Sequence, residues 1–159
     1  MKKLLAVFFA LALAFTAIGS TPAMALGNGN AHLFWRDGHL NNHVFGKKPL
    51  LNSPSNPNPV GYVADQDVDV RQAWFIINTS LGPKWIGFNE DSYPMSVGRY
   101  EPAYGKIHAT EYKIPLYNNP GDPRVVGYVA SQWLTATQAW FLIRTSLGEK
   151  WIGYNMDRP

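Results

Sequence analysis

Aromatic residues recur at matched positions in two parts of the chain, and their type suits the recognition of sugars. Trp and Tyr rings stack on the apolar faces of sugar rings and give a large contact area for a small loss of side-chain entropy. A groove lined by such rings binds a glycan without carrying out a reaction. The candidate ligand-binding residues are Trp74, Trp85, Trp140, Trp151, Tyr62, Tyr128, Tyr117 and Tyr154.

The same tryptophans are also suited to fill a hydrophobic core. The chain contains no Cys, so packing has to stabilise it without disulfides. Trp74 and Phe75 are consecutive and would point to opposite faces of a strand, so only one of them can lie fully inward. Trp85 and Ile86 divide in the same way. Two outcomes stay open: at least one Trp of each matched segment lies in the core, or at least one lines a ligand groove.

Three acidic residues alternate along one segment in a way that resembles calcium ligands. They are Asp65, Asp67 and Asp69, but the residues that follow lack the Gly and the distal Glu of an EF-hand loop. The positions that match them in the second segment hold Ser131, Trp133 and Thr135. We therefore expect a solvated strand face here and no metal site.

Histidines are concentrated near the start of the first matched segment. His32, His39 and His43 lie within a dozen residues, and imidazole is a common zinc ligand. The string Gly-His-Leu-Asn-Asn-His lacks the Glu of the H-E-x-x-H metalloprotease signature. We interpret these residues as surface histidines in an N-terminal extension, not as metal ligands.

No recognisable motif for nucleophilic or acid–base catalysis occurs in the chain. Cys is absent, and no Gly-x-Ser-x-Gly string places a Ser nucleophile. Carboxylates for glycoside hydrolysis could be chosen from Asp91, Glu101 and Glu111, but nothing singles out a pair. We expect no enzyme, no catalytic residue and no cofactor. A small hydrolase that depends on His39 or His43 is the remaining catalytic alternative.

An internal repeat organises the chain. Residues 47–91 align with residues 113–157 at a constant offset of 66 and without a gap. The identical strings are GYVA at 61–64 and 127–130, AWF at 73–75 and 139–141, TSLG at 79–82 and 145–148, and KWIG at 84–87 and 150–153. Each copy begins in a divergent segment, so we expect one module over residues 29–95, with matched core 47–91, and another over 98–159, with matched core 113–157.

Within each copy the pattern is typical of an all-β domain. Short runs rich in aromatic and β-branched residues predict strands over residues 60–64, 73–78 and 84–89, and Gly82 can take the positive φ of the turn before the last one. The Pro-rich segments 52–59 and 118–123 cannot be central strands and predict a long loop. A helix over residues 135–145 is the competing interpretation.

The first 25 residues have the three parts of a secretory signal peptide. Lys2 and Lys3 give a positive start, Leu4 to Ala17 is an uncharged apolar run, and small residues precede a cleavage point after Ala25. The run is shorter than the roughly 20 residues that span a bilayer core. We therefore expect a secreted protein with no membrane span in its mature form.

The charge of the chain argues against a nucleic-acid partner, and its cysteine content indicates an origin. The net charge of +3 includes Lys2 and Lys3, which leave with the signal peptide, so the mature charges nearly cancel. Nucleic-acid binders normally carry a basic stripe, and none is visible, so we expect no nucleic-acid partner. An exported chain without Cys also favours a bacterial origin.

The order of elements in each copy resembles a bacterial SH3-type module, in particular the cell-wall-associated forms with Gly-Trp repeats. The residues that carry the resemblance are Pro115-Leu116, the Pro-containing loop that follows, the strand Val126-Gly127-Tyr128-Val129, and an aromatic hairpin that ends in Trp151-Ile152-Gly153. The resemblance implies two tandem small SH3-like β-barrels that recognise peptidoglycan or a wall-associated polymer without catalysis. The near-neutral charge departs from that family and favours binding by aromatic grooves.

Two classes of function follow from this reading. The first is an exported binding protein that recognises a cell-envelope polymer and stays non-covalently associated with the cell wall. The second is a secreted protein–protein interaction factor, an enzyme inhibitor or regulator, that uses the same β surfaces or an exposed edge strand.

Overall fold

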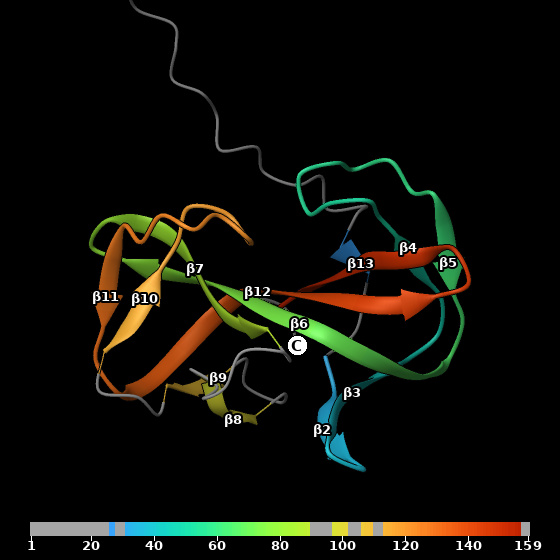
Figure 1. Cartoon of the computed structure of the whole chain (residues 1–159), viewed down its shortest axis with the longest axis horizontal. Helices are drawn as coiled ribbons and strands as arrows, with labels where there is room; N and C mark the ends of the chain where they lie inside the picture. The colour runs from blue at the N-terminus through green and yellow to red at the C-terminus, as the bar shows by residue number, and fades with distance from the viewer. Residues whose placement is uncertain (1–25, 28–30, 90–96, 102–105, 110–112, 157–159) are drawn as a thin grey trace, which may run out of the picture.

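A computed structural model describes residues 26–27, 31–89, 97–101, 106–109 and 113–156, and every regular element among them is a β-strand (Figure 1). The strands are β1 (Leu26–Gly27), β2 (Leu33–Arg36), β3 (His39–Val44), β4 (Lys48–Leu50), β5 (Gly61–Val63), β6 (Gln66–Thr79), β7 (Gly82–Asn89), β8 (Val97–Glu101), β9 (Lys106–Ala109), β10 (Ile114–Leu116), β11 (Gly127–Val129), β12 (Gln132–Thr145) and β13 (Gly148–Asn155). The all-β expectation is confirmed. The helical interpretation of residues 135–145 is wrong, because they belong to β12.

The N-terminal signal segment, residues 1–25, lies outside the described residues. In the part of the chain that is described, no helix has the length and apolar character needed to cross a membrane.

Two long hairpins, β6–β7 and β12–β13, dominate the molecule. Apolar side chains alternate along β6, which places Ala73, Phe75 and Ile77 on one buried face and Trp74 on the other. The strand predicted at 73–78 is therefore confirmed, but β6 begins earlier, at Gln66, because its first residues pair with β3.

A two-residue turn closes each of these hairpins. Gly82 has φ 81° and Gly148 has the same value, which confirms the need for glycine at the turn. The Thr79 hydroxyl donates a 2.7 Å hydrogen bond to the Gly82 carbonyl and accepts one from the Leu81 amide at 3.1 Å. Thr145 makes the same two bonds in the second copy.

The two copies pair with each other through their longest strands. β6 and β12 are antiparallel neighbours, and Trp74 lies opposite Trp140, its own counterpart at the offset of 66. One residue to either side, Phe75 lies opposite Ala139 and Ala73 opposite Phe141, so each pair is the image of the other. This register defines a pseudo-twofold axis between Trp74 and Trp140.

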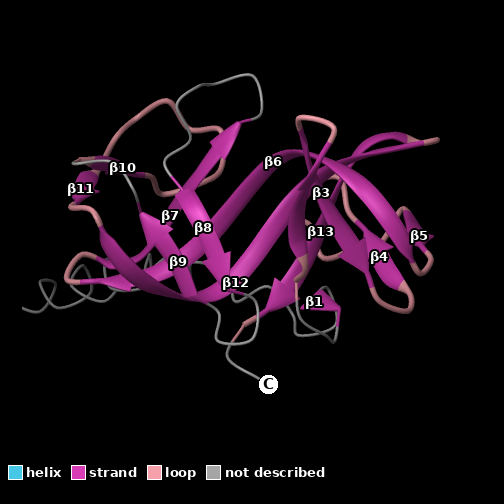
Figure 2. Cartoon of the chain, turned by 90° about the horizontal axis from the view of Figure 1, so that it is seen from below, coloured by secondary structure: helices cyan, strands magenta, loops and turns pink. Residues whose placement is uncertain are grey.

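The divergent segments form a second pair of hairpins. β2 and β3 pair with each other, and β3 then pairs with β6 (Figure 1). β8 and β9 stand in the same relation to β12 (Figure 2). Asn42 of β3 lies opposite Val68, and Ile107 of β9 lies opposite Leu134, the counterpart of Val68. The interpretation of His43 as part of an N-terminal extension is thus wrong, because β3 is a paired strand of the main sheet.

Two small ladders, β4–β5 and β10–β11, lie at opposite ends of the long axis (Figure 1). Each continues onto the hairpin of the other copy: Leu51 and Trp151 exchange backbone hydrogen bonds of 2.8 and 2.9 Å, and Tyr117 and Trp85 do the same. The ladder of each copy therefore pairs with the long hairpin of the other copy. Among the described residues, no set of pairings closes a sheet into a barrel.

The interior divides into two clusters on opposite faces of the β6–β12 pair. The larger core contains Phe75, Phe141, Ile77 and Ile143, which are almost fully buried. The smaller cluster, which we call the tryptophan cluster, consists of Leu51, Trp74 and Trp140, with Trp85, Tyr117 and Trp151 packed against it.

Candidate functional site

Trp74 and Trp140 lie inside the tryptophan cluster and not on a surface. Trp140 has no exposed area and Trp74 is 8% exposed, which confirms that each copy contributes a Trp to the core. The indole N–H of Trp74 donates to the Gln72 side chain at 3.0 Å, and that of Trp140 donates to Gln138 at the same distance. Their polar atoms are thereby satisfied within the protein, so these two rings stabilise the fold.

Trp85, Trp151 and Tyr117 are partly buried at the margin of the tryptophan cluster. The Tyr117 ring packs edge-on against Trp74, with centroids 5.6 Å apart and planes at 80°. Gly87 of β7 lets the strand lie close to Trp74, because a Cβ there would lie 2.9 Å from the Trp74 Cα and 2.3 Å from the Ala73 backbone oxygen. These three rings cover the central pair and expose only part of their area.

Tyr154 is fully buried on the other face of the sheet, in the large core. Together with the buried Asn42 and Lys48 it forms a polar group there. Asn42 donates a 2.6 Å hydrogen bond to the Tyr154 hydroxyl, and the Lys48 ammonium lies 4.2 Å from the ring centroid. Burial raises the pKa of the Tyr154 phenol and lowers the pKa of Lys48 from 10.5 to about 8. Tyr154 is therefore placed for packing and not for surface contact.

The pseudo-twofold axis relates this polar group to an apolar one. The positions that correspond to Asn42, Lys48 and Tyr154 in the other half hold Ile107, Ile114 and Phe88. Ile107 and Ile114 are fully buried. Two positions of the polar group are therefore held by buried apolar residues in the other half, and the polar group is an asymmetric feature of one half.

Tyr62 and Tyr128 are the candidate residues that the fold leaves well exposed, at 57% and 54%. Each lies on the outer face of a small ladder, opposite a proline in the neighbouring strand: Pro49 for Tyr62 and Pro115 for Tyr128. The inner faces of the two ladders carry Leu50 and Leu116, which are 3% exposed. Side chains alternate between the two faces of a strand. Because the leucines face the core, the tyrosines on the opposite face point to solvent.

A lysine accompanies each exposed tyrosine. The Lys47 ammonium lies 4.2 Å from the ring centroid of Tyr62, and that of Lys113 lies 4.0 Å from the ring of Tyr128. We call these two surfaces the end patches: the first consists of Lys47 and Tyr62 with the buried Pro49 opposite the ring, and the second of Lys113 and Tyr128 with the half-buried Pro115 opposite the ring. The repeat predicts the tyrosines as candidates but does not single out the lysines, although both lysines obey the offset of 66.

Each end patch is supported from behind by the other copy. A Cβ on Gly61 would lie 3.0 Å from Leu147 Cδ1 at the tip of the β12–β13 hairpin. A Cβ on Gly127 would lie at the same distance from Leu81 Cδ1, at the tip of the β6–β7 hairpin. Each leucine packs directly against the glycine backbone, at a distance that leaves little room for a Cβ. The two end patches are therefore equivalent in construction.

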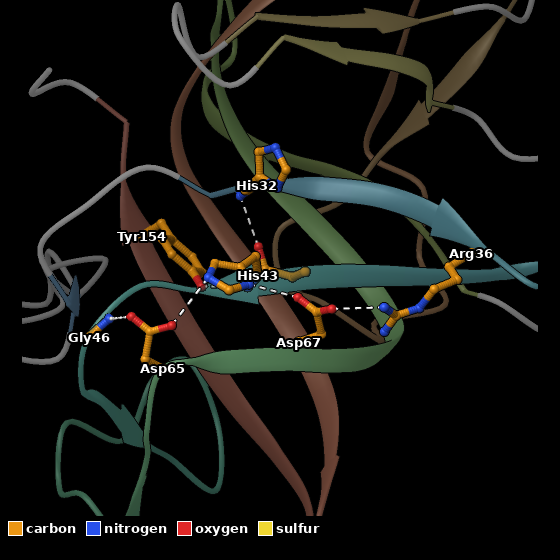
Figure 3. Close-up of polar contacts among 8 residues, drawn as sticks. His32, Arg36, His43, Gly46, Asp65, Asp67 and Tyr154 are labelled. Carbon is orange, nitrogen blue, oxygen red and sulfur yellow. Dashed lines mark hydrogen bonds and ion pairs between the residues drawn. The ribbon is translucent and has the colours of Figure 1, made fainter.

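A charged cluster on the first copy has no equivalent in the second (Figure 3). His43 lies between two carboxylates: its Nδ1 is 2.7 Å from Asp67 and its Nε2 is 3.2 Å from Asp65. Asp67 also accepts a 2.9 Å hydrogen bond from Arg36, and Asp65 accepts one from the Gly46 amide at 3.0 Å. The hydrogen bond to His43, aided by Arg36, holds the pKa of Asp67 below its usual range.

Through the contacts of His43 with Asp67 and Asp65, the cluster joins β3 to β6 and to the loop that precedes β6. The expectation of a solvated face is confirmed in part, because the Asp65 side chain is 61% exposed while Asp67 is 33% exposed. Within the described ranges, no group of three or more His, Cys, Asp or Glu is arranged to hold a metal ion. Asp91 and Glu111, two of the carboxylates considered for hydrolysis, lie outside the described residues.

No protein-family model, no curated protein and no solved structure matches the chain.

Proposed function

We propose that the protein is exported and binds a cell-envelope polymer, peptidoglycan or a wall-associated glycan, at its two end patches, and that it carries out no catalysis. The observation that carries this proposal is the pair of exposed rings, Tyr62 at 57% and Tyr128 at 54%, each built in the same way from a strand, a proline and a lysine. An exposed tyrosine ring gives a large contact area for a sugar face at a small loss of side-chain entropy.

The chemistry of an end patch suits a sugar. A phenol ring offers an apolar surface to the C–H face of a pyranose, and its hydroxyl can exchange hydrogen bonds with ring substituents. The ammonium of Lys47 or Lys113 adds three donors for hydroxyl, carboxylate or acetamido oxygens. Because the charges of the mature chain nearly cancel, ring contact and hydrogen bonding contribute more to this binding than long-range attraction.

The features at the start of the chain support export, and the order of elements supports a relation to bacterial SH3-type modules. Each copy has the short ladder, the Pro-containing loop and the aromatic hairpin on which the resemblance rests. In this proposal the ancestral module has been duplicated and its copies now exchange strand partners instead of folding separately.

Co-sedimentation of the purified mature protein with isolated cell-wall sacculi tests the proposal. We expect the wild type to pellet with sacculi at both low and high salt, and the Tyr62→Ala/Tyr128→Ala double variant to stay in the supernatant. The exposed Phe45 lies outside both end patches and is 52% exposed, so Phe45→Ala is the matched control and should pellet like the wild type.

Two results would contradict the proposal. The first is a wild-type protein that stays in the supernatant with sacculi at every salt concentration. The second is a stoichiometric protein partner captured from culture supernatant by a wild type that has no affinity for sacculi, which would favour the interaction-factor alternative.

A further inference from the structure

The end patches are related by the pseudo-twofold axis that passes between Trp74 and Trp140. The offset of 66 maps each residue pair of β6 and β12 onto a pair of the same register, and the two register shifts map onto each other. The first end patch lies on β4–β5 and the second on β10–β11, at opposite ends of the long axis in both views (Figures 1 and 2). The molecule therefore presents one binding surface twice, facing away from its centre in two directions.

A twofold rotation has a definite consequence for a ligand with direction. The line that joins two equivalent sites is perpendicular to a twofold axis, and the rotation reverses any direction along that line. A glycan strand has distinct reducing and non-reducing ends. A single strand that ran from Tyr62 to Tyr128 would meet one patch in the opposite sense to the other, so it could fit only one of them correctly.

The two patches are also held in fixed orientation. In a tandem joined by a flexible linker, one module could turn to present its site in the same sense as the other. Here the copies share the β6–β12 pair, and the bridges of Leu51 to Trp151 and Tyr117 to Trp85 fasten each ladder to the opposite hairpin. Among the described residues, these pairings hold the two patches in one relative orientation, so neither patch can turn to restore a common direction.

We propose that the protein bridges two separate glycan strands, one at each end patch, and does not gain avidity along a single strand. The proposal rests on the proposed function of the end patches and adds the way in which the two act together. Both patches then make identical contacts, because each strand can approach in the direction that its own patch requires.

A sandwich assay tests the bridging. Protein is first bound to sacculi, excess protein is washed away, and fluorescently labelled soluble glycan strands, released enzymatically from the same walls, are then added before pelleting. We expect the wild type and Phe45→Ala to capture labelled strands well above the level of sacculi alone. Tyr62→Ala and Tyr128→Ala each keep one intact patch, so they should still pellet but capture at least about tenfold less label, since a lost contact of about 1.4 kcal/mol is tenfold in affinity.

The outcomes separate the two proposals. A wild type that pellets with sacculi but captures no labelled strand would overturn bridging and leave the binding function intact. Single-patch variants that capture as much label as the wild type would also overturn bridging. A wild type that does not pellet at all overturns the binding function and the bridging with it. Thermal denaturation followed by circular dichroism verifies that each variant is folded.

Discussion

Trp74 and Trp140 lie directly opposite each other in the antiparallel pair of β6 and β12, each in register with its own counterpart in the other copy. This relationship makes two sequence repeats into one interleaved unit, because the longest strand of each copy completes the sheet of the other. The large core and the tryptophan cluster contain residues from both copies, and each end patch is supported from behind by a leucine of the other copy. The protein should therefore unfold as a whole.

Removal of the Trp140 side chain tests this cooperativity. Trp140 is fully buried, so Trp140→Ala should lower the free energy of unfolding by about 3–5 kcal/mol through lost burial and the cavity left behind. Trp74→Ala should give a similar loss in the same single transition in urea. Trp133 is 44% exposed, and Trp133→Ala should cost much less. Two transitions, of which each substitution shifts only one, would mean that the copies fold independently.

Gly61 and Leu147 provide a contact between copies that can be measured. Gly61→Ala should cost about 1 kcal/mol, the low end for overpacking, because the half-exposed Leu147 can move away from the new methyl group. Leu147→Ala should relieve this cost, whereas Leu81→Ala should leave it unchanged. In the equivalent double-mutant cycle of the other copy, the cost of Gly127→Ala should be relieved by Leu81→Ala and not by Leu147→Ala. Coupling to the leucine of the same copy would contradict the interleaved arrangement.

Lys48 gives the fold a defined pH dependence. Its pKa in the folded protein is about 8, against 10.5 as the usual value, so between these pH values the unfolded chain binds more protons than the folded one. Stability should therefore rise with pH in this window, by about 3 kcal/mol in total relative to Lys48→Ile. Urea denaturation of both proteins from pH 7 to 10.5 measures the difference.

Tyr154 acts in the opposite sense at higher pH, because burial raises its pKa, but both proteins retain it and its effect largely cancels in the comparison. A constant difference between wild type and Lys48→Ile across the range would show that Lys48 keeps its charge state on folding.

The asymmetric pair of Asn42 and Tyr154 should behave as a unit. Tyr154→Phe alone leaves the buried Asn42 amide without its 2.6 Å partner and should cost about 1–3 kcal/mol. Asn42→Ile/Tyr154→Phe reproduces Ile107 and Phe88 of the other half and should recover most of that loss. Denaturation midpoints of the two single variants and the double variant give the coupling. A double variant that is less stable than Tyr154→Phe would contradict the equivalence of the two halves.

The sequence was sufficient for the local structure but not for the way in which the copies meet. Strand periodicity, the turn glycine Gly82 and the Pro-rich loops each predict an element that forms where expected, because these signals act over a few residues. The pairing of β6 with β12 depends on which long strand finds which partner. Because β6 and β12 share half of their residues, the repeat does not decide which neighbour each long strand takes.

The candidate site was predicted in part for a similar reason. The candidates are all Trp or Tyr in or beside the repeat, yet Trp140 and Tyr154 are buried while Tyr62 and Tyr128 are exposed. Alternation separates neighbours such as Trp74 and Phe75, but the tryptophan cluster buries the second face of the sheet as well. Only the contacts of Leu51 and Tyr117 across the copies explain why that face is covered.

The most direct test of the binding account is a map of backbone amide chemical shifts in the isotope-labelled mature protein during titration with soluble wall-glycan fragments. The account predicts saturable shifts at Gly61 and Tyr62 and equal shifts at Gly127 and Tyr128, with both sets lost in Tyr62→Ala/Tyr128→Ala. Shifts confined to the charged cluster around His43, or no shifts at any fragment concentration, would contradict it.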